Sequence, residues 1–103
     1  MEKNRVEILS EFVQMKPKDS FARYGLAMEL SRLGENQKAL EHFRKLWELN
    51  PDYTPAYFQA GMLLAKIGET ATAREVLSQG VQSAARTNDL HAKSEIESAL
   101  AEL

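Results

Sequence analysis

The sequence contains no cysteine, which excludes disulfide bonds, thiolate metal sites and cysteine nucleophiles. Neither sign of charge dominates: the formal net charge is -2, so the chain lacks the positive field that favours nucleic acid. No stretch reaches the ~20 apolar residues of a membrane-spanning helix, and the N-terminal residues mix both charges with apolar ones, unlike a signal peptide. We therefore expect a cytoplasmic protein that binds neither nucleic acid nor membrane.

Motifs of catalysis and cofactor binding are also missing. The sequence has no Gly-rich phosphate loop, no G-x-S-x-G and no H-E-x-x-H. Its two histidines are far apart, and we expect His42 to lie on a solvated surface. His91 and Glu95 are spaced i,i+4 and predict a pair on one helix face, but two ligands do not make a closed metal site. We expect no enzyme, no metal and no cofactor.

The residues that are abundant favour helix. Ala, Leu, Glu, Lys and Gln dominate, whereas Val and Ile are few. Hydrophobic residues make up 44% of the chain and charged residues 27%, which is ordinary for a globular domain. No segment alternates apolar and polar residues for long enough to form a strand. The composition predicts an all-α domain.

The chain also repeats itself at one fixed offset, the separation between Ala22 and Ala56. Further identical pairs at this offset include Met28/Met62, Leu30/Leu64, Gly34/Gly68, Ala39/Ala73 and Pro17/Pro51. Conservative pairs at the same offset include Tyr24/Phe58, Arg32/Lys66 and Phe43/Leu77. So many matches at one offset exceed what chance gives, and they predict tandem structural units.

Each unit has the pattern of two helices joined by a tight turn. Leu26, Leu30 and Leu33 are three or four residues apart, as on the buried face of a helix. Glycine follows that face at the place where a helix ends in a left-handed residue. Hydroxyl or carboxylate side chains are expected to cap the later helices. The predicted turn glycines are Gly34 and Gly68, and the predicted caps are Thr54, Thr70 and either Asn88 or Asp89.

This pattern resembles the tetratricopeptide repeat, a unit of about 34 residues with a small residue in its first helix, Gly at the turn, A-x3-F and a closing Pro. The first unit carries Ala27, Gly34, Ala39, Phe43 and Pro51, and the second carries Gly61, Gly68, Ala73 and Leu77. Arg23 departs from the family's early Trp, whereas Tyr57 suits that place. The resemblance implies antiparallel helix-turn-helix repeats stacked as a short right-handed superhelix.

The register predicts one domain over residues 1–103. It consists of an N-terminal half-repeat helix (1–17), repeat 1 (20–53), repeat 2 (54–87) and a C-terminal capping helix (88–103). The last segment is interpreted either as a solvating cap or as the first helix of a third unit.

The resemblance further implies that the first helices of the units line a concave groove for a peptide. Taken by helical phase, the groove residues are Phe21, Tyr24, Met28, Arg32, Phe58, Met62, Lys66, Ala92, Lys93 and Ile96. The alternative is that these side chains pack against neighbouring helices. Family members that grip the acidic tails of heat-shock chaperones use Lys, Asn and Arg in such a groove. Here Tyr24, Met28, Gln59 and Asp89 stand at four of five matching places, so we expect a different specificity.

Self-association is the alternative to a binding module. The N-terminal segment has an apolar face that a second copy could cover, which makes a homodimer a hypothesis. The residues of that face are Val6, Ile8, Leu9, Phe12 and Val13. Trp47 is expected either to pack against the next unit or to form a self-association contact. The predicted function is a protein-protein interaction module, with a structural self-association unit as the alternative.

Overall fold

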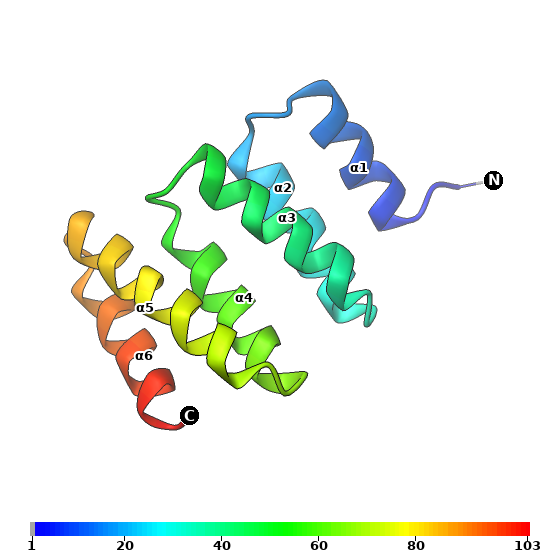
Figure 1. Ribbon diagram of the computed structural model, residues 1–103. Helices are drawn as coiled ribbons and strands as arrows, with labels where there is room; N and C mark the ends of the chain where they lie inside the picture. Colours follow the sequence, from blue (N-terminus) through cyan, green and yellow to red (C-terminus); the bar gives the residue numbers. More distant parts are fainter. Residues whose placement is uncertain (1) are drawn as a thin grey trace. The chain divides into compact units, whose positions relative to one another are not determined.

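The computed structural model describes residues 2–103, and the secondary structure within that range consists of six helices without a strand (Figure 1). The helices are α1 (Arg5–Met15), α2 (Ser20–Arg32), α3 (Asn36–Leu49), α4 (Thr54–Lys66), α5 (Thr70–Arg86) and α6 (Leu90–Ala101). The predicted all-α fold is confirmed.

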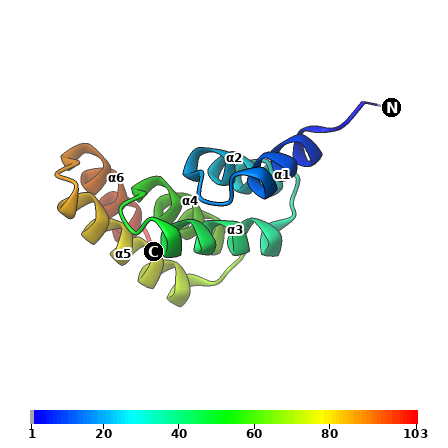
Figure 2. The same cartoon turned by 90° about the horizontal axis from the view of Figure 1, so that it is seen from above.

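The helices divide into two compact units, an N-terminal unit that ends at Asn50 and a C-terminal unit that begins at Pro51. In the N-terminal unit, α2 packs against both α1 and α3. In the C-terminal unit, α5 packs against both α4 and α6 (Figure 2). Successive helices within each unit run antiparallel, as the predicted helix-turn-helix pattern requires.

The helix boundaries reproduce the period of the sequence. Ser20 and Thr54 begin the first helices of the two repeats, and Asn36 and Thr70 begin the second helices. Both pairs are separated by the same offset as the identical residues Gly34 and Gly68. A tight turn joins the two helices of each repeat, and the period therefore sets where the helices of each repeat begin.

Glycine makes these turns as predicted. Gly34 and Gly68 have φ values of 80° and 87°, in the left-handed region that glycine enters without a Cβ penalty. The residue after each glycine donates its backbone N–H across the turn, at 2.9 Å for Glu35 and 2.8 Å for Glu69. Asn88, with φ of 56°, occupies the equivalent place between α5 and α6.

The predicted helix caps are right at one of three places. Asp89 caps α6 by accepting a hydrogen bond from the backbone N–H of Ala92 at 3.0 Å. Thr54 and Thr70 are instead the first residues of their helices, and neither helix has a side-chain cap. The Thr54 hydroxyl is buried and hydrogen-bonds the Ser83 hydroxyl of α5 at 2.7 Å, because packing turns it towards α5 and away from its own backbone.

The core of each unit consists of apolar side chains from its three helices. The buried apolar residues of the N-terminal unit are Val13, Leu26, Ala27, Leu30, Ala39, Leu40, Phe43 and Leu46. Those of the C-terminal unit are Ala56, Tyr57, Ala60, Leu63, Leu64, Ala73, Val76, Leu77, Ala84 and Ile96. Leu33, predicted to lie in the core, is 53% exposed. It follows the last residue of α2 and lies at the turn, beyond the packed part of the helix.

The expectation of a solvated His42 is wrong. Its ring is half-buried, and Nδ1 lies 3.2 Å from Nη1 of Arg23, which is only 8% exposed. Arg23 also donates from Nη2 to the Pro17 carbonyl at 3.1 Å, but its buried Nε finds no hydrogen-bond partner among residues 2–103. Burial lowers the pKa of both side chains, and the Arg23 charge lowers the pKa of His42 further.

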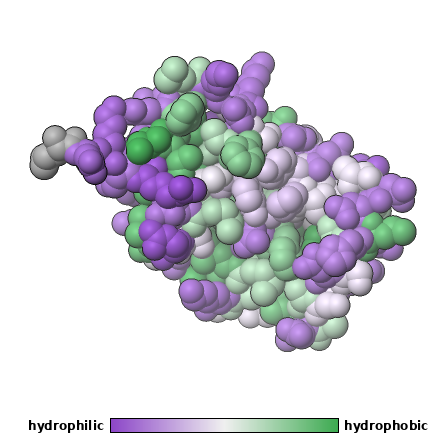
Figure 3. Space-filling model, turned by 180° about the vertical axis from the view of Figure 1, so that it is seen from behind, coloured by the Kyte–Doolittle hydropathy of each residue, from purple (hydrophilic) through white to green (hydrophobic). Residues whose placement is uncertain are grey.

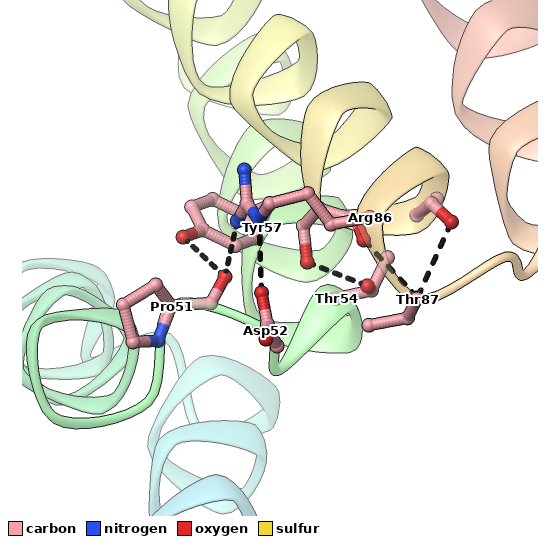
Figure 4. A network of polar contacts seen from close by, with 8 residues as sticks. Pro51, Asp52, Thr54, Tyr57, Arg86 and Thr87 are labelled. Carbon is pink, nitrogen blue, oxygen red and sulfur yellow. Dashed lines mark hydrogen bonds and ion pairs between the residues drawn. The ribbon is translucent and has the colours of Figure 1, made fainter.

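Tyr57 stands in repeat 2 at the position equivalent to Arg23 and makes the equivalent hydrogen bond in the C-terminal unit. Its hydroxyl donates to the Pro51 carbonyl at 2.8 Å (Figure 4). Arg86 donates to the same carbonyl at 3.0 Å and from Nε to Asp52 at 2.9 Å. This network ties the start of α4 to the end of α5.

Candidate functional site

Within residues 2–103, no group of three or more His, Cys, Asp or Glu side chains is placed to hold a metal ion. No helix in the same range has the length and apolar character needed to cross a membrane. The predicted pair on α6 is present, with His91 Nε2 lying 3.2 Å from Glu95 Oε1. Each unit also has a surface hollow large enough to receive a side chain of a ligand.

The larger hollow, here called the α1/α2 hollow, has a volume of about 490 Å³. Its lining residues are Arg5, Leu9, Phe21, Tyr24, Gly25, Met28, Glu29 and Arg32. All four groove residues predicted for this unit are therefore brought together in one place. The most exposed of them is Phe21, at 81%.

Helical spacing and a close helix contact form this hollow. Phe21, Tyr24, Met28 and Arg32 are three or four residues apart and lie on one face of α2. Gly25 has no side chain, so its backbone faces the Leu9 side chain of α1 directly. A Cβ added at Gly25 would lie 3.5 Å from Leu9 Cδ2, which is an ordinary contact distance. The Tyr24 ring meets Phe43 edge to face, with centroids 6.2 Å apart, which holds the tyrosine against the core.

Charged groups border the apolar wall. Glu29 is largely buried and binds Arg32 through both oxygens, at 2.5 Å and 3.2 Å, while Arg5 lies 3.5 Å from Oε2. The hydrogen bond from Arg32, together with the charges of both arginines, lowers the pKa of Glu29. The α1/α2 hollow thus has two exposed guanidinium groups, those of Arg5 and Arg32, and one carboxylate, that of Glu29, which already pairs with both arginines.

The smaller hollow, here called the α4/α6 hollow, has a volume of about 290 Å³. Its lining residues are Thr54, Pro55, Phe58, Gln59, Asp89, Ala92, Glu95 and Ile96. Three predicted groove residues, Phe58, Ala92 and Ile96, are among them. Ile96 is only 1% exposed, so it belongs to the core and forms the floor, not an open wall.

The other predicted residues of this unit lie outside the α4/α6 hollow. Met62 is 43% exposed on α4, Lys66 is exposed at the end of the same helix, and Lys93 is half-buried on α6. None of the three is a lining residue. The C-terminal half of α4 therefore contributes exposed surface but no part of this hollow.

Sequence reasoning missed charged residues in both hollows. Asp89 and Glu95 line the α4/α6 hollow, and no Lys, Arg or His is among its lining residues. The sequence pattern identifies Asp89 as a helix cap and Glu95 as the partner of His91, and only the family resemblance places Asp89 at a groove position, where it counted against an acidic ligand. Asp89, Ala92 and Ile96 are spaced i, i+3 and i+7, which is the pattern that could have placed the aspartate on the same face.

A separate apolar stripe lies on α1. Ile8, Phe12 and Met15 are exposed and follow one another at helical spacing, and none of them lines the α1/α2 hollow. Figure 3 shows hydrophobic surface close to the N-terminal end of the chain, with hydrophilic side chains around it. We call these three residues the α1 stripe.

Comparisons with known proteins agree on one family. The sequence profile of the tetratricopeptide repeat matches residues 30–101. A TPR repeat-containing protein of Pseudomonas aeruginosa is 26% identical over 91 residues, which are 88% of this chain and 87% of that protein.

Solved structures show the same likeness. A tetratricopeptide repeat domain protein from Salinibacter ruber has 31% identity and a TM-score of 0.79, covering 84% of this chain and 88% of its own. The TPR2B domain of yeast Sti1, solved as a pHsp70 complex, has a TM-score of 0.86 at 23% identity, covering 92% and 76%. At that identity the Sti1 likeness concerns the fold alone.

Proposed function

Because the chain belongs to the tetratricopeptide repeat family, we propose that it is a protein-interaction module that binds a peptide or protein segment in the α1/α2 hollow. The observation that carries this proposal is the 81% exposed Phe21 beside a hollow of about 490 Å³. The TPR2B domain of Sti1, which shares this fold, forms a complex with pHsp70, so the fold is compatible with binding a partner. We propose no catalytic role.

The chemistry of the hollow suits an apolar side chain of a partner. Leu9, Tyr24 and Met28 offer an adaptable apolar wall, since thioether side chains change shape easily. Burying a leucine- or phenylalanine-sized side chain contributes about 1.5–3 kcal/mol. The two exposed guanidinium groups of Arg5 and Arg32 can then pair with carboxylates or carbonyls that flank the apolar residue.

Selection of peptides from a random twelve-residue display library tests this proposal. Phe21→Glu should weaken binding of the selected peptides about tenfold or more, because it places a charge where an apolar residue docks. Phe12→Glu is the matched control, since Phe12 is an exposed phenylalanine outside the hollow. Helical content and melting temperature should match the wild type in both variants. Equal binding by both variants would place the site elsewhere.

The α1 stripe supports a second candidate, self-association. Ile8, Phe12 and Met15 form an exposed apolar face that a second copy could bury. If this candidate is right, sedimentation velocity shows a concentration-dependent dimer for the wild type and for Phe21→Glu, but a monomer for Phe12→Glu. A wild type that stays monomeric at high concentration removes the candidate.

A further inference from the structure

We propose that the α4/α6 hollow binds an arginine side chain of the partner polypeptide. The proposal rests on the proposed function, because it concerns a side chain of the polypeptide that the protein is proposed to bind. The hollow is mostly apolar and about 290 Å³ in volume, with two carboxylates and no cation among its lining residues. Its charge is therefore complementary to a basic side chain and opposed to an acidic one.

Both carboxylates keep an oxygen for a ligand. Asp89 uses Oδ1 to accept the backbone N–H of Ala92, and Glu95 uses Oε1 to meet His91. The second oxygens, Oδ2 and Oε2, make no hydrogen bond within the part of the chain that the structure describes. An ionised carboxylate can accept several hydrogen bonds, so each can receive a guanidinium N–H without losing its present partner.

The apolar part of the lining favours arginine over a compact ammonium. Phe58 and Ile96, with Pro55 at the rim, provide surface for the three methylene groups of an arginine stem. The planar guanidinium can stack on the face of Phe58 while its N–H groups point to the carboxylates. A lysine ammonium is more strongly hydrated and presents no plane to stack, so it should bind more weakly.

Other occupants meet the two carboxylates unfavourably. An acidic side chain would bring a third negative charge into the hollow. An apolar side chain would remove water from Asp89 and Glu95 without supplying a hydrogen bond, which is costly for ionised groups. Among these side chains, arginine best matches both the apolar surface and the two carboxylates of the hollow.

The test uses the same display library with three forms of the full chain. Asp89→Asn/Glu95→Gln removes both charges from the hollow, and asparagine caps a helix as well as aspartate does. Glu97→Gln/Glu102→Gln is the matched control, because it removes two exposed charges that do not line the hollow. We expect arginine at a fixed position of the peptides selected by the wild type and by the control, and no such arginine with Asp89→Asn/Glu95→Gln.

A synthetic peptide from the selection then measures the contact directly. Replacing its arginine by alanine should weaken binding to the wild type about tenfold, but should change binding to Asp89→Asn/Glu95→Gln less than twofold. Arginine that persists with Asp89→Asn/Glu95→Gln overturns the inference, and so does selection of peptides without arginine that still depend on Phe21. The latter result leaves the proposed function intact. Recovery of no peptide at all contradicts both.

Discussion

The contact between α4 and α5 predicts that Gly61→Ala destabilises the protein, although alanine is the better helix former. A Cβ at position 61 would lie 2.5 Å from Cγ of Leu77, with Cδ2 closer still. Leu77 is fully buried. Its Cγ is near the root of the side chain, so the whole leucine must move within a packed core.

The magnitude follows from two opposing terms. Replacing Gly by Ala inside a helix favours folding by about 1 kcal/mol. Overpacking a tightly packed core opposes folding by about 1–3 kcal/mol. Because the leucine has no solvent to move into, the upper part of that range applies, and we expect Gly61→Ala to lower the free energy of unfolding by about 1–2 kcal/mol. For a chain of this size that corresponds to a fall of roughly 5–15 °C in melting temperature.

Gly25→Ala is the matched control. Its Cβ would lie 3.5 Å from Leu9 Cδ2, an ordinary contact distance. Alanine has the higher helix propensity and here causes no steric clash, so we expect Gly25→Ala to raise the free energy of unfolding by about 0.5–1 kcal/mol. Urea unfolding followed by circular dichroism, with linear extrapolation to water, measures both variants.

A double-mutant cycle assigns the effect to Leu77. Leu77→Ala alone should cost about 2–5 kcal/mol. In the Gly61→Ala background it should cost about 1–3 kcal/mol less, because it also removes the clash. The reasoning is refuted if Gly61→Ala is at least as stable as the wild type, or if Leu77→Ala costs the same in both backgrounds.

Three further predictions concern the turn and buried polar groups. Burial and then the Arg23 charge lower the pKa of folded His42 below 6.5. The contribution of neutral His42 to stability is therefore present above pH 6.5 and is lost as the pH falls through the lowered pKa. The melting temperature should be lower at about pH 5.5 than at about pH 7.5. The double variant Arg23→Tyr/His42→Val copies Tyr57 and Val76, which hold the equivalent positions of repeat 2. It should raise the free energy of unfolding by about 1–4 kcal/mol and make the melting temperature less dependent on pH. A lower free energy of unfolding in urea would contradict this prediction. Asn88→Gly should raise the free energy of unfolding by roughly 0.5 kcal/mol, since φ there is 56°, and a lower melting temperature would count against that account.

The fold was predictable because its signals are local and occur twice. Each turn needs a residue in the left-handed region, and glycine marks that need at Gly34 and Gly68. The repeat period fixes where the helices begin, at Ser20 and Thr54 for the first helices. Two independent copies of one pattern remove most of the ambiguity that a single helical stripe leaves.

What the sequence did not reveal depends on contacts between residues distant in the chain. The Thr54 hydroxyl looked like a helix cap, but its actual partner, Ser83, is 29 residues away. His42 looked exposed because it stands beside Glu41 in the sequence, yet it meets Arg23 of the preceding helix. A pattern within one helix does not show which polar group the neighbouring helix supplies.

In the candidate site, too, the residues on one helix were predictable, whereas those positioned by packing between helices were not. Helical phase grouped Phe21, Tyr24 and Met28 with Arg32, and all four line one hollow because they lie on one face of one helix. It did not show that Arg5 of α1 and Glu95 of α6 line the hollows, because their positions depend on how helices pack. Phase within α4 likewise included Met62, although the hollow there is formed only by the first half of the helix.

The carbonyl groups of Pro17 and Pro51 each accept a hydrogen bond from the side chain of the residue six positions later. The donor is the guanidinium group of Arg23 in the first case and the phenol group of Tyr57 in the second. Two chemically different side chains thus serve the same structural purpose, because each is long enough to donate a hydrogen bond to the proline carbonyl. Repeats of this kind can therefore drift apart in residue identity while their geometry stays fixed. Comparing them by which atom donates to which backbone oxygen should reveal kinship that residue matching overlooks.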